Sequence, residues 1–218
     1  YDSNIYFISE YVCCHTSCER DMKKNIIVFK INGAIKRFIL LFYPLAFPQK
    51  GNEQINDPER LALYSYCKGL GVDVGCGSRK THPNALGVDL VLKGEVGKFG
   101  SEKRQISEAD IRASGDNLYM FADNVLDYVV SRHTLEHLKN PVKTLKEWKR
   151  VLRRNGILGV ILPNNETVDT IKLDPTHKHV FTMKSFKKII DDIGGFKIIK
   201  LSVCVPDWSF VCIAKKVN

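Results

Sequence analysis

The stretch Val72-Asp73-Val74-Gly75-Cys76-Gly77-Ser78 decides the fold class of this chain. It begins as a short apolar run bounded by glycines, which is typical of a buried parallel strand. In open α/β sheets such a strand leads to the carboxyl edge, where ligands bind. Gly75 and Gly77 allow a sharp turn there, and they allow a ligand to approach without meeting a Cβ atom. Because a lone Gly-x-Gly also serves purely structural turns, the neighbouring segments have to decide its meaning.

Strand-like and helix-like segments alternate along the rest of the chain. We expect strands at 70–74, 85–90, 124–131, 157–162, 196–205 and 209–215. We expect helices at 59–68, 141–154 and 183–193, the last capped by Thr182. Alternation implies a mostly parallel sheet, and Pro206-Asp207 separates the last two strands as an antiparallel hairpin. The sequence therefore predicts an α/β fold with a Rossmann-like, mostly parallel sheet and an antiparallel C-terminal hairpin.

Two acidic residues follow the glycine bend in an informative order. Asp89 ends the second strand, where a carboxylate can accept hydrogen bonds from both ribose hydroxyls of a nucleoside. The alternative for Asp89 is a solvated strand end. Asp110 comes next and could meet an adenine amino group, with Ile111 packing on the ring.

The first crossover is unusually short, since only residues 78–86 lie between Gly77 and Gly87. A parallel crossover normally takes a dozen residues or more and includes a helix. The first helix is therefore expected to be short or missing. A pyrophosphate needs the helix N-terminus that follows such a loop, so the short crossover favours a phosphate-free nucleoside over a dinucleotide.

Together these segments resemble the class I S-adenosylmethionine-dependent methyltransferases, especially members with a type-11-like domain whose loop reads GCGxxKxPxAxGVD. The matching stretches are VDVGCGS at 72–78, GVDL at 87–90, ADI at 109–111, LDYVVSRHTLEHLKNP at 126–141 and KEWKRVLRRNGILGVILPN at 146–164. The resemblance covers roughly residues 68–215. One departure is Arg79, which stands where the family usually has a third glycine and could face a ligand carboxylate or solvent.

The resemblance implies S-adenosylmethionine as the cofactor and methyl transfer as the reaction. The residues that it implies for cofactor binding are Asp73, Gly75, Cys76, Gly77, Asp89, Leu90, Asp110, Ile111 and Ser131. A side chain at Gly75 is expected to invade the donor site.

The residues after the 124–131 strand are candidates for acting on the acceptor. Methyl transfer needs aligned reactants and exclusion of water, and a base only when the acceptor is protonated. His133 is the best base candidate because its ordinary pKa is near neutral, and His137 would share a helical face with it. The alternative is that Glu136 and His137 only fix the loop.

The substrate side is expected to include Arg132, Glu136, His177 and His179. The histidines and Glu136 also resemble the metal ligands of small-RNA 2′-O-methyltransferases, which use two Glu and two His. Here His133 stands where the first Glu would be. Carboxylate and imidazole residues at such a spacing also occur without binding a metal. The sequence therefore assigns no metal.

The N-terminal part differs from the rest, and we divide the chain into an N-terminal segment, 1–57 (a lid, a cap or partly disordered), and a methyltransferase domain, 58–218. The apolar stretch 38–47 is too short for a membrane span and contains Pro44. The group Cys13, Cys14, His15 and Cys18 lacks a second Cys-x-x-Cys half, so no zinc site is assigned. Seven cysteines without a regular framework indicate a reducing compartment and a cytoplasmic location.

The formal net charge of +9 favours anionic partners, although the basic residues are scattered along the chain. We expect a small-molecule or a sugar- or lipid-linked acceptor. The alternatives are an RNA methyltransferase, motivated by the charge, and a non-catalytic binding protein, motivated by the missing glycine and helix. The sequence leaves the oligomeric state open.

Overall fold

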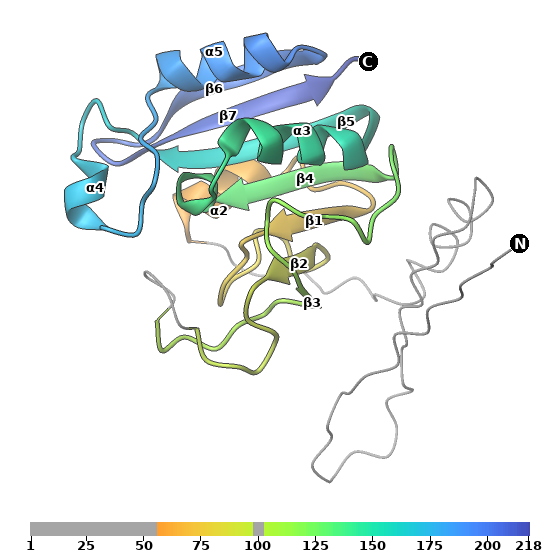
Figure 1. Ribbon diagram of the computed structural model, residues 1–218, viewed down its shortest axis with the longest axis horizontal. Helices are drawn as coiled ribbons and strands as arrows, with labels where there is room; N and C mark the ends of the chain where they lie inside the picture. Colours follow the sequence, from red (N-terminus) through yellow and green to blue (C-terminus); the bar gives the residue numbers. More distant parts are fainter. Residues whose placement is uncertain (1–55, 98–102) are drawn as a thin grey trace, which may run out of the picture.

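The computed structural model describes residues 56–97 and 103–218 (Figure 1). The cysteine group at 13–18, the apolar stretch at 38–47 and all but the last two residues of the N-terminal segment lie outside the described residues. The domain boundary after residue 57 stays a prediction.

The described residues form one sheet in the order β3-β2-β1-β4-β5-β7-β6. Strands β1 to β5 pair in parallel, and β7 is antiparallel to both β5 and β6. This confirms the predicted mostly parallel sheet with its antiparallel hairpin. The strands are β1 Gly71–Val74, β2 Leu86–Asp89, β3 Ile111–Arg112, β4 Leu126–Arg132, β5 Leu152–Pro163, β6 Phe196–Val205 and β7 Ser209–Lys216.

The three expected helices are present, and two short elements were not expected. The helices are α2 Pro58–Tyr64, η2 Leu135–His137, α3 Pro141–Val151, α4 Thr170–Leu173 and α5 Met183–Ile193. Helices α3 and α5 cover one face of the sheet and α2 covers the other (Figure 1). In 56–97 and 103–218, none of the helices has the length and apolarity that a bilayer crossing requires.

The sheet has a buried core on each face because successive side chains of a strand point to opposite sides. On β4, Val129 packs into the cluster that includes Trp148 of α3 and Phe186 of α5. The next residue, Val130, packs into the smaller cluster that includes Leu63 of α2. The central strands are therefore buried on both sides, and only their ends are open to ligands.

Helix α3 ends earlier than the sequence indicated, at Val151. The amides of Asn124 and Val125 donate to the carbonyls of Arg150 and Val151, both at 2.9 Å. The chain leading into β4 therefore satisfies the end of the helix, and β5 starts directly at Leu152. The expected extension of α3 to residue 154 was wrong because these partners lie far away in the sequence.

A buried lysine completes this junction. Lys216, which is 6% exposed, donates from Nζ to the carbonyls of Lys149 and Leu152, both at 2.7 Å, and to Asn124 Oδ1 at 2.8 Å. Burial, together with the charge of Lys149, lowers the pKa of Lys216. The ammonium meets the negative end of the α3 dipole, so it caps the helix from the last strand.

We predict that Lys216→Met lowers the free energy of unfolding by about 2–4 kcal/mol, because it leaves buried carbonyl groups without a donor. Urea denaturation followed by circular dichroism measures this change. Lys215→Met on the same strand is the matched control and should change stability little. Equal effects of the two substitutions would contradict the capping role.

Candidate functional site

The glycine bend lies at the carboxyl end of β1, between β2 and β4 (Figure 1). Gly75 and Gly77 have φ of +70° and +53°, which glycine adopts without strain. The amide of Gly75 donates to Val88 of β2 at 2.7 Å. A Cβ atom on Gly75 would lie 2.0 Å from Thr134 Oγ1. A side chain at Gly75 would therefore meet Thr134 first, and the expectation that it invades the donor site stays a prediction.

Residues 75–85 contain turns and no helix, which confirms the short crossover. Asp73, only 1% exposed, accepts the amide of Thr81 at 2.5 Å. Arg132 of β4 donates to Thr81 Oγ1 at 3.1 Å and also to the carbonyl of Arg79. Burial raises the pKa of Asp73, and the Arg132 charge opposes that effect. Asp73 therefore supports the loop from within, and its contact with the cofactor stays a prediction.

Arg132 has the same supporting role, which differs from its expected place on the substrate side. Its Nη1 lies 3.3 Å from Oδ2 of Asp57, the residue that caps α2. Arg132 thus connects β4, the crossover loop and the start of α2. The contacts described for Arg132 all join these structural elements to one another.

Asp89 lies at the end of β2 and faces the bend. Its Oδ2 accepts the Gly77 amide at 3.0 Å. Its Oδ1 accepts the amides of Leu90 at 2.6 Å and Val91 at 3.4 Å. The side chain is partly exposed, and Leu90 beside it is 54% exposed. The carboxylate and an exposed apolar side chain are therefore adjacent at the carboxyl edge.

Asp110 binds the start of β2 and the crossover. Its Oδ2 lies 2.8 Å from Lys80 Nζ and accepts the Gly87 amide at 2.9 Å. Ile111 is partly buried against the main core cluster. The contacts of Asp110 thus explain its position structurally, and its contact with adenine stays a prediction.

Two of the expected cofactor residues direct their side chains into the protein. Cys76 is buried, and its Sγ faces Gly87: a Cβ atom added to Gly87 would lie only 2.7 Å from that sulfur. Burial and the nearby Asp73 carboxylate raise the pKa of Cys76 well above its usual range. Ser131 is fully buried and donates to the Val74 carbonyl at 2.9 Å. Only the backbone of Cys76 remains available to a ligand, and Ser131 connects β4 to β1.

His133 does not have the properties of a general base. Its Nε2 lies 2.9 Å from both carboxylate oxygens of Glu59, and its Nδ1 lies 3.6 Å from Glu136 Oε1. Burial alone would lower the pKa of His133, but Glu136 and Glu59 outweigh it and raise the pKa to about 9. His133 is therefore an imidazolium at neutral pH. The sequence did not indicate this pairing because Glu59 comes from α2, far away in the sequence, and a catalytic role of His133 stays a prediction.

The expected shared helical face of His133 and His137 was also wrong. His133 has φ of +49°, and only Leu135–His137 form the 3₁₀ turn η2. Thr134 lies between His133 and this turn, and its hydroxyl donates to the Arg132 carbonyl at 3.0 Å. The two imidazoles consequently have different neighbours.

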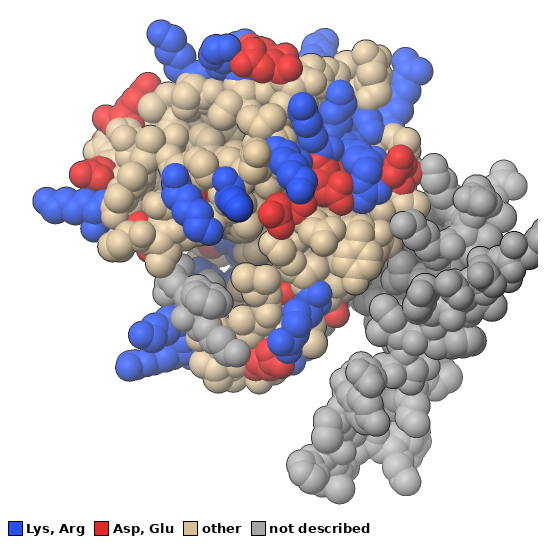
Figure 2. Space-filling view, in the orientation of Figure 1, with Lys and Arg blue, Asp and Glu red and all other residues tan. Residues whose placement is uncertain are grey.

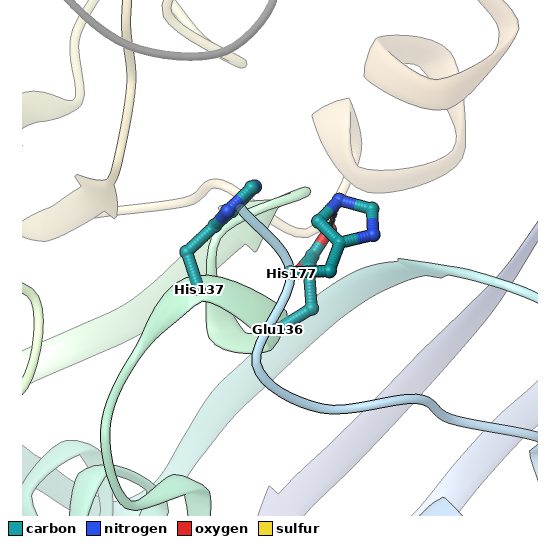
Figure 3. A group of neighbouring side chains, drawn as sticks. All are labelled: Glu136, His137 and His177. Carbon is teal, nitrogen blue, oxygen red and sulfur yellow. Dashed lines mark ion pairs between the residues drawn. The ribbon is translucent and has the colours of Figure 1, made fainter. Parts of the chain in front are cut away.

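Glu136, His137 and His177 come together at the carboxyl edge (Figure 3). The loop before α5 reaches η2 because the Lys178 amide donates to the Glu136 carbonyl at 2.8 Å. His179 lies outside this group, with Nε2 at 3.3 Å from the Lys139 carbonyl. The expected substrate-side cluster is therefore smaller than the sequence suggested.

An open hollow of about 530 Å³ lies beside His133 and is lined in part by Asp57, Glu59, Arg79 and Trp208. Trp208 packs on His133 with ring centroids 5.4 Å apart. Sequence reasoning missed Glu59 and Trp208, since neither belongs to a recognisable local motif. Both reach the site only through the packing of α2 and the β6–β7 turn.

The His133 ion pairs predict a pH dependence of stability. Because the folded pKa is raised from 6.5 to about 9, their stabilisation is complete below pH 6.5 and is lost as pH rises through about 9. In buffer with a chelator, we expect unfolding free energy to fall by about 2–3 kcal/mol across this window. His133→Asn, which tolerates positive φ, should flatten the profile. Parallel profiles for the two proteins would contradict the assignment.

Comparison with known proteins agrees with this geometry. Residues 72–160 match the model of a family described as methyltransferase domain. An uncharacterized protein of Methanocaldococcus jannaschii is 36% identical over 114 residues, which are 50% of this chain and 54% of that protein. The chain thus spans about half the length of the curated relative that it matches.

Solved structures share the fold at low sequence identity. One is a Thermotoga maritima S-adenosylmethionine-dependent methyltransferase, described as a possible histamine N-methyltransferase, with a TM-score of 0.53, 17% identity and coverage of 84% of this chain and 98% of that one. Another is the Burkholderia thailandensis 1,6-didemethyltoxoflavin-N1-methyltransferase with bound 1,6-didemethyltoxoflavin and S-adenosylhomocysteine, with a TM-score of 0.54, 15% identity and coverage of 74% and 77%. Residues 72–160 thus match a methyltransferase domain, and the chain shares its fold with solved S-adenosylmethionine-dependent methyltransferases.

Proposed function

We propose that this chain transfers a methyl group from S-adenosylmethionine to a small-molecule or a sugar- or lipid-linked acceptor. The observation that carries the proposal is the carboxylate of Asp89, which accepts the Gly77 amide at the carboxyl edge. This edge is where open α/β sheets bind nucleosides. In the proposal, the ribose lies on Asp89 and the rest of the donor crosses the glycine bend.

The surroundings of Asp89 suit this role. A carboxylate offers about four acceptor positions, and backbone amides use three of them here. The longest of these bonds, from the Val91 amide at 3.4 Å, is the one that a ribose hydroxyl would most easily replace. The exposed side chain of Leu90 offers an apolar surface for the adenine.

The chemistry requires little from the chain beyond positioning. The acceptor atom attacks the methyl carbon in line, and the sulfonium leaves as a neutral thioether. As an imidazolium, His133 would orient the acceptor or stabilise negative charge on it, and it would not remove a proton. An amine that is unprotonated, or an oxygen acceptor that is already deprotonated, needs no base for the attack.

Two observations favour a small acceptor over RNA. The hollow beside His133, about 530 Å³ in volume, has a size suited to a small molecule. On the face in Figure 2, Lys and Arg side chains are interspersed with Asp and Glu side chains. The net charge is then the only observation in favour of an RNA acceptor, and a net charge does not identify a binding surface.

A reducing, cytoplasmic location is also part of the proposal. The cysteines in the described part of the chain are free thiols, namely Cys67, Cys76, Cys204 and Cys212. Free thiols are the common state in a reducing compartment.

We predict that S-adenosylhomocysteine binds the chain and that Asp89→Ala weakens binding by about 5–150-fold, because lost hydrogen bonds of this kind cost about 1–3 kcal/mol. Isothermal titration calorimetry measures the affinity. Asp192→Ala, on the exposed face of α5, is the matched control and should bind like the wild type. Asp89→Asn, which keeps one acceptor oxygen, should have an intermediate affinity. The absence of binding heat with the folded wild type would contradict the proposal, and an unchanged affinity of Asp89→Ala would contradict the role of Asp89.

A further inference from the structure

We propose that Glu136, His137 and His177 bind a divalent transition-metal ion (Figure 3). One ligand atom of each residue lies within 4.8 Å of the other two. Two residues come from η2, and the third comes from the loop between α4 and α5. The inference goes beyond methyl transfer and does not depend on it.

Glu136 is the strongest argument for a cation. Its side chain is 1% exposed, and neither carboxylate oxygen has a hydrogen-bond partner. Oε1 lies 3.6 Å from His133 Nδ1 and 4.0 Å from His177 Nε2, both beyond hydrogen-bond length. Burying a carboxylate without hydrogen bonds is unfavourable by several kcal/mol. A bound dication would contact these oxygens directly, which the His133 imidazolium at 3.6 Å does not.

His177 also lacks a partner for a buried nitrogen. Its Nδ1 is buried without a hydrogen-bond partner. Its Nε2 lies 4.0 Å from both Glu136 Oε1 and Asp174 Oδ2. A neutral imidazole has one nitrogen with a free lone pair, and metal coordination satisfies such a nitrogen without a donor from the protein.

The third ligand, His137, is held in the tautomer that coordination by Nε2 requires. Thr176 Oγ1 donates its only proton to Asp174 Oδ1 at 2.6 Å. The same oxygen lies 3.1 Å from His137 Nδ1, so Nδ1–H must be the donor in that contact. The lone pair is then on Nε2. Ligand histidines commonly have such an outer hydrogen bond, which fixes the ring and its proton.

The backbone keeps the two segments together. The amides of Lys178 and His179 both donate to the Glu136 carbonyl, at 2.8 and 3.2 Å. Metal–ligand bonds of about 2.0–2.2 Å bring ligand atoms to within about 3–4 Å of each other. From a separation of at most 4.8 Å, small side-chain rotations are sufficient to close the site.

The donor set indicates the class of metal. Two imidazoles and one carboxylate suit Zn²⁺, Mn²⁺, Fe²⁺ or Co²⁺, whereas Mg²⁺ and Ca²⁺ prefer oxygen ligands. Three protein ligands leave coordination positions open. Thr134, whose side chain faces Gly75, directly precedes η2, so the ion would lie close to the glycine bend. An open coordination position on the ion would there bind an oxygen atom of the methyl acceptor.

Cobalt titration tests the site. The full chain, without an affinity tag, is treated with EDTA, dialysed and titrated with Co²⁺, and the visible d–d absorption is recorded. We expect one Co²⁺ per chain. Glu136→Gln and His177→Ala should weaken binding at least about 100-fold, and Thr176→Val should weaken it about 10–100-fold, as outer hydrogen-bond partners do. His179→Ala is the matched control, because His179 lies outside the group, and should bind like the wild type.

Each outcome decides the inference. Absence of stoichiometric Co²⁺ binding, or unchanged affinity in both Glu136→Gln and His177→Ala, would overturn it. Near-ultraviolet circular dichroism identifies a variant that does not fold, in which case the other ligand variant decides. Titration of the same samples with S-adenosylhomocysteine keeps this test separate from the proposed function. Donor binding without Co²⁺ binding refutes only the metal site, and Co²⁺ binding without donor binding refutes only the methyl-transfer proposal.

Discussion

The buried carboxylate of Asp73 is the interaction on which the site depends. It lies on β1 with 1% exposure, accepts the Thr81 amide and faces the charge of Arg132. Arg132 extends the connection to Asp57, which caps α2. One buried charge network therefore holds the crossover loop, the central strands and α2 in register. Removing one partner of such a network is unfavourable by about 3–5 kcal/mol, because it leaves the other charge uncompensated.

This network takes the place of a helix. A crossover helix would present free amides and a positive dipole end to a phosphate. Here Asp73, Asp89 and Glu108 instead accept amides of the loop, those of Thr81, Gly77 and Lys80. Carboxylates around the bend repel the negative charge of a pyrophosphate, whereas they do not repel a positively charged sulfonium. The electrostatics of the loop thus agree with a methyl donor better than with a dinucleotide.

Local patterns in the sequence were sufficient to predict six of the seven strands, the C-terminal hairpin and the missing helix; the two-residue strand β3 and the early start of β5 at Leu152 were not predicted. Burial periodicity and turn residues encode these features within a few neighbouring positions. The chemistry of His133 could not be predicted in this way, because its pKa depends on Glu59 of α2. The inward direction of Ser131 and the approach of His177 to Glu136 likewise depend on packing between distant segments. The end of α3 was misplaced for the same reason, since the amides of Asn124 and Val125 satisfy it.

The central claim is that the donor lies on the helix-free bend and on the end of β2. Amide hydrogen exchange with mass spectrometry, recorded with and without S-adenosylhomocysteine, tests it most directly. The account predicts slower exchange in both 75–81 and 88–91 on addition of the ligand, with the α5 region unchanged. Protection confined to other segments, or no protection at saturating ligand, would contradict it.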